Sequence, residues 1–210
     1  MALRLPTAQR VEPTLETRRL YLREPLARDW QVWAELRNVS RDFLSPWEPI
    51  WAADGLSRAN YRRRLRRLAR DEADDLGYAY FLFRRVDEGL LGGVTLGNVQ
   101  RGAAQSATVG YWMGRRFAGQ GYMTEALGAV LAHAFGPLGL HRIEAACMPE
   151  NERSRRLLDR WGFREEGLAR QYLKINGVWH DHAMYALLAA EFPRAAERVE
   201  KRLASGPAGG

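Results

Sequence analysis

The amino-acid sequence predicts an α+β protein built around one mixed β-sheet. Segments with alternating apolar residues recur between segments whose apolar residues have helical spacing. Strands joined by turn residues dominate the first half of the chain, and strands alternating with helices dominate the second half. The single cysteine, Cys147, excludes an intrachain disulfide and a metal site built from several cysteines.

The first half is predicted to hold one strand, two helices and a three-stranded meander. Asp29 and Ser57 are typical helix N-caps, and each precedes apolar residues at helical spacing. The aromatic segment between these helices, residues 43–51, holds two prolines, which predicts a loop rather than a regular helix. The strands are expected at residues 18–23, 78–84, 90–97 and 106–113.

The second half is predicted to alternate helices and strands. A helix is expected at residues 121–135, and a second at 152–161 is closed by Gly162, a good left-handed cap. The expected strands are residues 142–148, 163–167 and 178–188. A charged helix at 191–203 completes the fold.

Length and charge restrict the class of protein. At 210 residues, the chain is long enough for one domain, which we expect at residues 17–190, with an N-terminal extension at 1–16 and a C-terminal helix and flexible tail at 191–210. The net charge of +7 favours an anionic partner: a phosphorylated cofactor, nucleic acid or an acidic surface. Because no signal peptide or membrane-spanning run is evident, we expect a cytoplasmic monomer or homodimer.

The most informative segment leads from the strand ending at Met113, through a glycine-containing turn, to a helix N-terminus. Free amides and the helix dipole form an anion site there, and Gly119 and Gly121 allow close backbone approach. Arg115 and Arg116 add positive charge. The spacing fits neither a P-loop nor a dinucleotide fingerprint. Spacing alone leaves an ordinary glycine turn with two surface arginines as an equal alternative.

Four blocks of sequence resemble one known family. Arg116-x-x-Gly119-x-Gly121 is similar to the Q/R-x-x-G-x-G/A signature of the GNAT N-acetyltransferases. GYMTEAL at 121–127 resembles the GYATEAL of the RimJ/RimL branch, as do PENERS at 149–154 and LLDRWGFREEG at 157–167. Residues 43–49 and 172–182 resemble RimJ more than RimL. The blocks follow the family's order from about residue 17 to 188, so the resemblance is specific.

This resemblance implies a GNAT-type fold with a splayed, mostly antiparallel sheet flanked by helices, and acetyl-CoA as cosubstrate without a metal. The sheet would open between residues 106–113 and 142–148. The pantetheine arm would follow the first of these strands, and a backbone N–H near Met113 would stabilise the oxyanion. The residues implied to bind the cofactor are Met113, Arg115, Arg116, Gly119, Gln120, Gly121, Tyr122, Met123, Thr124, Asn151 and Ser154.

Ser154, Asn151 and Glu144 are the candidate catalytic residues. The resemblance implies that Ser154 donates a proton to the thiolate and that Asn151 holds the pantetheine amide. Asn151 is equally suited to be the N-cap of the following helix, and Ser154 should face inward. Glu144 is a candidate general base, although an ion pair with an arginine is favoured. A RimL-type glutamate shortly before Asn-Gly is not evident, which leaves the base open.

The acceptor is predicted to be the N-terminal α-amine of a protein, such as a ribosomal protein, with Trp47, Trp51 and Tyr172 in the acceptor mouth. A small amine (a polyamine, an amino acid or an antibiotic) is the close alternative. A non-catalytic acyl-CoA sensor or RNA-binding module is the alternative from another class. The arginine-rich helix from Arg58 to Arg70 is interpreted as a solvated face, with contact to ribosomal RNA or an acidic partner as its functional alternative.

Overall fold

The computed structural model describes residues 15–204, and one eight-stranded mixed sheet runs through them. The strands lie in the order β1-β2-β3-β4-β5-β6-β8-β7, and every neighbouring pair is antiparallel except β5 and β6. The predicted α+β class is therefore confirmed. The strands are β1 Leu15–Glu16, β2 Leu20–Arg23, β3 Tyr78–Arg84, β4 Leu90–Gln100, β5 Ser106–Met113, β6 Arg142–Cys147, β7 Arg164–Ile175 and β8 Val178–Leu188.

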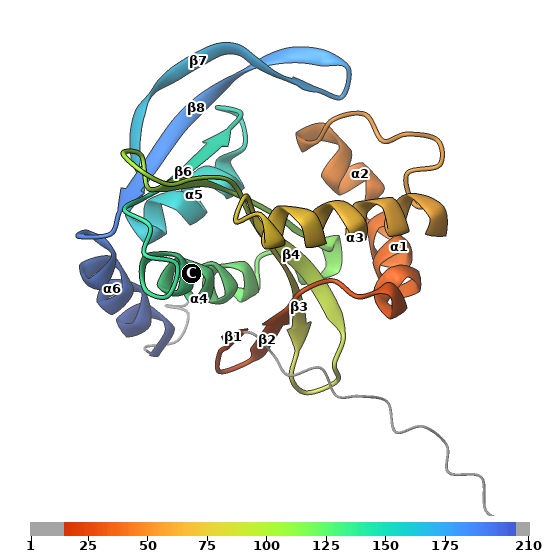
Figure 1. The fold of residues 1–210 in the computed structure, drawn as a ribbon, viewed down its shortest axis with the longest axis horizontal. Coiled ribbons are helices and arrows are strands. Elements are labelled where there is room, and N and C mark those ends of the chain that lie inside the picture. The colour runs from red at the N-terminus through yellow and green to blue at the C-terminus, as the bar shows by residue number, and fades with distance from the viewer. Residues whose placement is uncertain (1–14, 205–210) are drawn as a thin grey trace, which may run out of the picture.

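Helices cover the sheet from two sides. Figure 1 shows α1, α2 and α3 on the right, α4 and α6 at the lower left, and the β7–β8 hairpin arching over the top. The α-helices are α1 Trp30–Val39, α2 Arg41–Leu44, α3 Arg58–Ala73, α4 Tyr122–Phe135, α5 Glu152–Trp161 and α6 Phe192–Ala204. The 3-10 turns are Ala27–Asp29, Ser45–Trp47 and Arg115–Phe117. None of the helices between residues 15 and 204 is long and apolar enough to cross a membrane.

The sheet splays between β5 and β6, as the resemblance implied. These two strands share only the parallel pairs from Ser106↔Arg142 to Thr108↔Glu144. β5 continues to Met113 along β4, and β6 continues to Cys147 along β8. Each strand is therefore held on its outer side, while their facing edges beyond Thr108 and Glu144 have no partner strand.

Close packing fixes α4 and α5 beneath this opening. The apolar face of α4 is fully buried, including Leu127 and Val130. Trp161 of α5 lies against Gly128, where an added Cβ would come within 2.4 Å of the ring. Its indole N–H also donates to the carbonyl oxygen of Thr124 at 3.1 Å. The start of α4 is thus held by the end of α5.

Four predicted boundaries were wrong. The strand expected at 90–97 is β4, which extends to Gln100. The strand expected at 163–167 extends to Ile175, because its mostly exposed residues pair with β8 through the backbone and show no apolar alternation. The segment expected as a loop at 43–51 contains the end of α2 and a 3-10 turn in which Pro46 lies near the N-terminus, where a missing N–H has no consequence. The strand expected at 18–23 is β2, which begins at Leu20.

Most of the predicted extension at 1–16 and the predicted tail at 205–210 lie outside the described residues. Within α6, Ala195 and Val199 are buried, and the ring of Phe192 stacks on Trp161 with 6.0 Å between centroids. The helix predicted to lie beyond the domain therefore packs on the core, and the boundary at residue 190 stays a prediction.

Candidate active site

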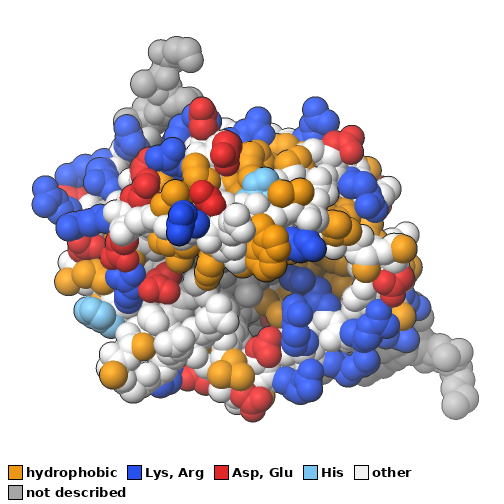
Figure 2. Space-filling view, turned by 90° about the horizontal axis from the view of Figure 1, so that it is seen from above, with side chains coloured by type: hydrophobic (Ala, Val, Ile, Leu, Met, Phe, Trp, Pro, Cys, Tyr) orange, Lys and Arg blue, Asp and Glu red, His pale blue; other side chains and the backbone are white. Residues whose placement is uncertain are grey.

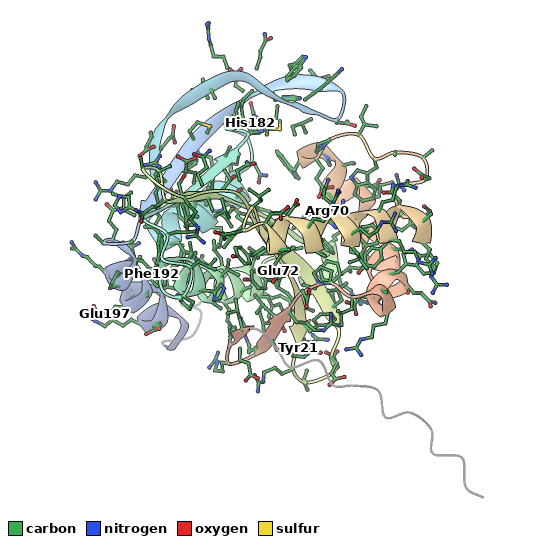
Figure 3. All side chains as sticks on the ribbon, in the orientation of Figure 1. Tyr21, Arg70, Glu72, His182, Phe192 and Glu197 are labelled. Carbon is green, nitrogen blue, oxygen red and sulfur yellow. The ribbon has the colours of Figure 1, made fainter. Side chains whose placement is uncertain are left out.

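A cavity of about 650 Å³ opens where β5 and β6 separate. Its walls come from these strands, the start of α4, α5, the segment from Phe43 to Pro49 and the β7–β8 hairpin. His182 lines it from the hairpin, and Figure 3 shows this residue beneath the β7–β8 ribbon. The volume lies within the range of sites for small molecules and cofactors.

The start of α4 has a geometry suited to binding an anion in this cavity. Gly119 and Gly121 both have φ +79°, in the left-handed region that favours glycine. Gly121 is the N-cap of α4, and no side chain caps this end of the helix. The amides of the first turn, beginning at Tyr122, therefore remain available to an anion. Met123 and Thr124 line the same wall, so five predicted cofactor residues meet here.

An ion pair between Arg19 and Glu125 stabilises the turn that leads into α4. The guanidinium of Arg19 donates to Glu125 at 2.6 Å and to the carbonyl oxygen of Gln120 at 3.2 Å. Thr17 and the backbone N–H of Arg19 also donate to Glu125. Burial disfavours the charged form of Glu125, but these hydrogen bonds outweigh burial and lower its pKa. Arg19 and Glu125 were not predicted, because their roles depend on contact between distant segments.

The structure does not bring Arg115, Arg116 or Gln120 to the cavity wall. The 3-10 turn Arg115–Phe117 directs Phe117 inward and leaves Arg115 and Arg116 exposed. Arg116 stacks on the ring of Phe117 at 4.5 Å and accepts a hydrogen bond at its carbonyl oxygen from the Gln120 side chain. The backbone N–H of Arg115 donates to Ser40. These three residues stabilise the turn.

Three arginines of α5 line the cavity instead. Arg153, Arg156 and Arg160 are spaced three and four residues apart, so they share one helix face. Arg160 donates to the hydroxyl of Thr124 at 3.1 Å, beside the free amides of α4. This arginine spacing was a sequence signal that could have identified them.

Ser154, Asn151 and Tyr111 meet at the opposite end of the cavity. The hydroxyl of Ser154 lies 2.7 Å from that of Tyr111, and the Asn151 side chain accepts a hydrogen bond from the Ser154 amide at 3.1 Å. Asn151 is therefore the N-cap of α5, as its structural alternative predicted. Burial raises the pKa of Tyr111, although the hydrogen bond to Ser154 opposes the shift. Tyr111 was not among the predicted residues.

Two further residues of β6 have different environments. Cys147 is buried in the cavity wall, and burial raises the pKa of its thiol, which remains protonated at neutral pH. Glu144 does not line the cavity. Its carboxylate accepts a hydrogen bond from Arg142 at 2.8 Å, the alternative that the sequence favoured over a role as general base.

Of the three predicted acceptor residues, one lines the first cavity and two do not. Trp47 lines the cavity and is 38% exposed, which suits a residue at its mouth. Tyr172 is exposed on β7 and contacts the ring of His182, 5.8 Å away, without lining the cavity. Trp51 lies in a second cavity, where the guanidinium groups of Arg37 and Arg41 stack on its ring.

Glu48 connects the mouth of the first cavity to helix α1 and to the tip of the β7–β8 hairpin. Its carboxylate accepts two hydrogen bonds from Arg37, at 2.9 and 2.5 Å, and one from the indole of Trp51 at 2.8 Å. Its carbonyl oxygen accepts from the backbone N–H of Asn176 at the hairpin tip. The loop and the hairpin therefore form one connected rim. No group of three metal-ligating side chains occurs among residues 15–204.

The splayed sheet and the free amides of α4 beneath it define the acyl-CoA N-acyltransferase fold. Residues 19–164 match the acetyltransferase (GNAT) domain family, and the chain belongs to this family. The chain is thus an acetyltransferase, as predicted.

Two curated relatives and one solved structure are similar over most of their length. The chain is 38% identical to the Probable N-acetyltransferase YjcK of Bacillus subtilis, over 83% of this chain and 96% of that protein. It is 34% identical to the [ribosomal protein uS5]-alanine N-acetyltransferase of Escherichia coli, over 85% and 92%. Mycobacterium smegmatis RimJ in complex with CoA-disulfide superposes with a TM-score of 0.82 and 35% identity, over 87% and 88%. The predicted RimJ/RimL relationship is confirmed.

Proposed function

We propose that this protein transfers an acetyl group from acetyl-CoA to the N-terminal α-amine of a protein, and that the acceptor is a ribosomal protein. The observation that carries the proposal is the similarity to the uS5-alanine N-acetyltransferase over most of both chains. The CoA-disulfide complex of the similar M. smegmatis RimJ supports coenzyme A as the ligand of the cavity.

In the proposed complex, the pyrophosphate binds the free amides at the start of α4, and Arg160 supplies positive charge beside them. The pantetheine arm follows β5 beyond Thr108, where the strand edge has no partner and can hydrogen-bond an extended amide chain. This placement brings the thioester toward Tyr111 and Ser154.

The acceptor nitrogen attacks the thioester carbonyl carbon, and the resulting oxyanion is stabilised by a backbone N–H near Met113. Collapse of the tetrahedral intermediate breaks the C–S bond, and Ser154 donates a proton to the leaving sulfur. Tyr111, whose raised pKa keeps the phenol protonated at neutral pH, can then pass a proton to Ser154 and take one back from water, so that neither hydroxyl is left ionised. The excess proton on the acceptor nitrogen is lost to water.

The scarcity of bases favours an α-amine acceptor. Among the described residues that line the cavity, Glu48 is the only carboxylate, and it is ion-paired with Arg37. With typical pKa values near 7.7–8.0, an α-amine has roughly 300-fold more neutral form at pH 7 than a lysine with a pKa near 10.4. An α-amine therefore depends less on an enzymic base.

A polyamine acceptor fits the cavity less well. Polyamines carry several positive charges and need carboxylates around the mouth. The lining has one carboxylate, already paired, against the positive side chains Arg153, Arg156, Arg160 and Lys174.

The proposed function is tested by release of coenzyme A with a panel of peptides that differ in their first residue, beside polyamines, amino acids and aminoglycosides. We expect turnover with peptides that have a free N-terminus and none with the same peptides blocked at the N-terminus. Turnover only with free small amines would contradict the proposal. Tight binding of CoA with no turnover on any acceptor would favour the sensor alternative.

Contact with the ribosome is proposed for the outward face of α3, where Arg58, Arg62 and Arg66 are exposed. Phosphate contacts would make the association weaken as salt is added. Co-sedimentation with ribosomes that is unchanged between low and high salt would contradict this electrostatic contact.

A further inference from the structure

A second cavity, of about 470 Å³, lies between α1, α3 and the loop from Trp51 to Leu56. Five arginines line it: Arg37, Arg63, Arg64, Arg67 and Arg70. No carboxylate is among its described lining residues. Figure 2 shows Lys and Arg side chains gathered at the lower right of the molecule, where α3 lies, and Figure 3 labels Arg70 on this helix.

Only two of these five arginines have a carboxylate partner in the described part of the chain. Arg37 is paired with Glu48, and Arg63 with Asp54 at 3.0 Å. Arg64, Arg67 and Arg70 follow one another at three-residue intervals on α3, and none of their side chains forms an ion pair or hydrogen bond with a residue between 15 and 204. Three of the five guanidinium groups therefore have no carboxylate partner within residues 15–204.

Arg64 is the most unusual of the three. Although α3 was interpreted as a solvated arginine face, this side chain turns inward, and its Nε is buried without a hydrogen-bond partner. The Nε of Arg37 is also buried and unpartnered. Burial, and then repulsion from Arg67 and Arg37, lowers the pKa of Arg64. Burying unpartnered charged donors is costly, and a bound anion removes that cost.

The lining and the volume of this cavity favour a small anionic molecule over a nucleic-acid strand. Trp33, Trp51 and Tyr61 face the same cavity, and the rings of Trp33 and Tyr61 pack at 4.9 Å. A volume of this size suits a small molecule. A nucleic-acid strand would instead meet the outward arginines of α3, such as Arg62 and Arg66, which do not line the cavity.

We propose that this second cavity binds a small molecule carrying two or more linked phosphate groups, held by Arg64, Arg67 and Arg70. Guanidinium groups bind phosphate oxygens in pairs of parallel hydrogen bonds, and several adjacent guanidiniums match several linked phosphates. The site is separate from the anion site at the start of α4, and no described residue lines both cavities. The two linings meet where Arg37, in the second cavity, is paired with Glu48, in the first.

The test uses the purified full chain and inorganic tripolyphosphate, titrated by calorimetry at fixed ionic strength with and without one molar equivalent of CoA. CoA carries a pyrophosphate itself, so it is held at the amount that fills the anion site of the first cavity once, which leaves the second cavity open to tripolyphosphate. We expect saturable one-to-one binding that persists with CoA. Arg64→Gln and Arg67→Gln should each weaken it about tenfold or more, since each removes charge-assisted hydrogen bonds.

Arg62→Gln and Arg66→Gln are the matched controls, because they remove the same charge from the same helix outside the cavity. They should change the dissociation constant by less than about twofold, as expected for exposed charges. Arg67 is exposed, so its variant remains informative if Arg64→Gln fails to fold.

Three results would overturn the proposal. The first is binding that CoA abolishes and Arg67→Gln leaves unchanged, which would place tripolyphosphate in the first cavity. The second is an equal loss in the control variants. The third is no binding of tripolyphosphate while an acidic peptide or an RNA oligonucleotide binds and depends on Arg64 and Arg67.

Discussion

The hydroxyl of Tyr111 lies 2.7 Å from that of Ser154, across the opening between β5 and α5. The two residues are 43 positions apart, and the splay of the sheet leaves room for a ligand beside them. Ser154 is held further by its backbone N–H, which donates to Asn151. In the proposed mechanism, this geometry would fix Ser154 as the proton donor beside the thioester, with the protonated Tyr111 hydroxyl as its neighbour.

Ser154→Ala is expected to lower kcat about 100-fold, because general acid catalysis typically contributes 10²–10⁴-fold. The dissociation constant for acetyl-CoA should change little, since the phosphate site at α4 is untouched. Steady-state kinetics and calorimetry measure the two quantities. Ser106→Ala, on β5 outside the cavity, is the control. An unchanged kcat would remove Ser154 from the mechanism.

Tyr111→Phe is expected to lower kcat less than Ser154→Ala, by about tenfold, because only the hydroxyl that is hydrogen-bonded to Ser154 is lost. If the two hydroxyls act as one unit, the double variant should be no slower than Ser154→Ala alone. Tyr80→Phe, a buried tyrosine outside the cavity, is the control. Full additivity of the two effects would contradict a shared proton route.

Arg160→Gln is expected to raise KM for acetyl-CoA about tenfold, since a charge-assisted contact beside the α4 amides is lost. Arg116→Gln should have an effect below about twofold, because Arg116 stacks on Phe117 outside the cavity. Initial rates at varied acetyl-CoA measure both. A larger increase in KM for Arg116→Gln than for Arg160→Gln would indicate that Arg116, the arginine of the family motif, binds the cofactor.

This contrast shows what the sequence could predict. The turn before α4 was predictable because Gly119 and Gly121 are typical of a left-handed backbone that leads into a helix. The direction of the neighbouring Arg115 and Arg116 was not, since a 3-10 turn can direct either side toward the core. Asn151 was predictable as an N-cap because capping is local.

Contacts between distant segments could not be predicted from the sequence. The Tyr111–Ser154 and Arg19–Glu125 pairs arise from the sheet topology, and no local pattern encodes them. The extension of β7 to Ile175 was missed because exposed residues paired through their backbone leave no hydrophobic period. The inward turn of Arg64 was hidden among its exposed arginine neighbours on α3.

Glu125 is expected to make stability depend on pH. Its pKa is lower in the folded protein than the ordinary value near 4.3 in the unfolded chain, so its ionised form stabilises the fold. That contribution is fully present above the unfolded pKa and is lost as pH falls through the lower folded pKa. Urea unfolding of wild type and Glu125→Gln should differ most at pH 7 and converge toward pH 3. A difference independent of pH would contradict this assignment.

Gly128→Ala is expected to destabilise the protein by up to about 2 kcal/mol. The added methyl would lie 2.4 Å from the Trp161 ring, and such overpacking typically costs about 1–3 kcal/mol, offset by about 1 kcal/mol of helix propensity. The ring cannot easily move, because Thr124 accepts its N–H and Phe192 stacks on it.

Urea denaturation followed by circular dichroism measures the free energy of unfolding of Gly128→Ala, of Trp161→Phe and of the double variant. Because the smaller ring removes the atoms that the methyl meets, Gly128→Ala should cost less in the Trp161→Phe background, and the difference is the coupling between the two positions. Gly97→Ala is a control, since no atom lies within 4 Å of its added Cβ. A stabilising Gly128→Ala, or equal costs in both backgrounds, would mean that glycine is not required where α5 crosses α4.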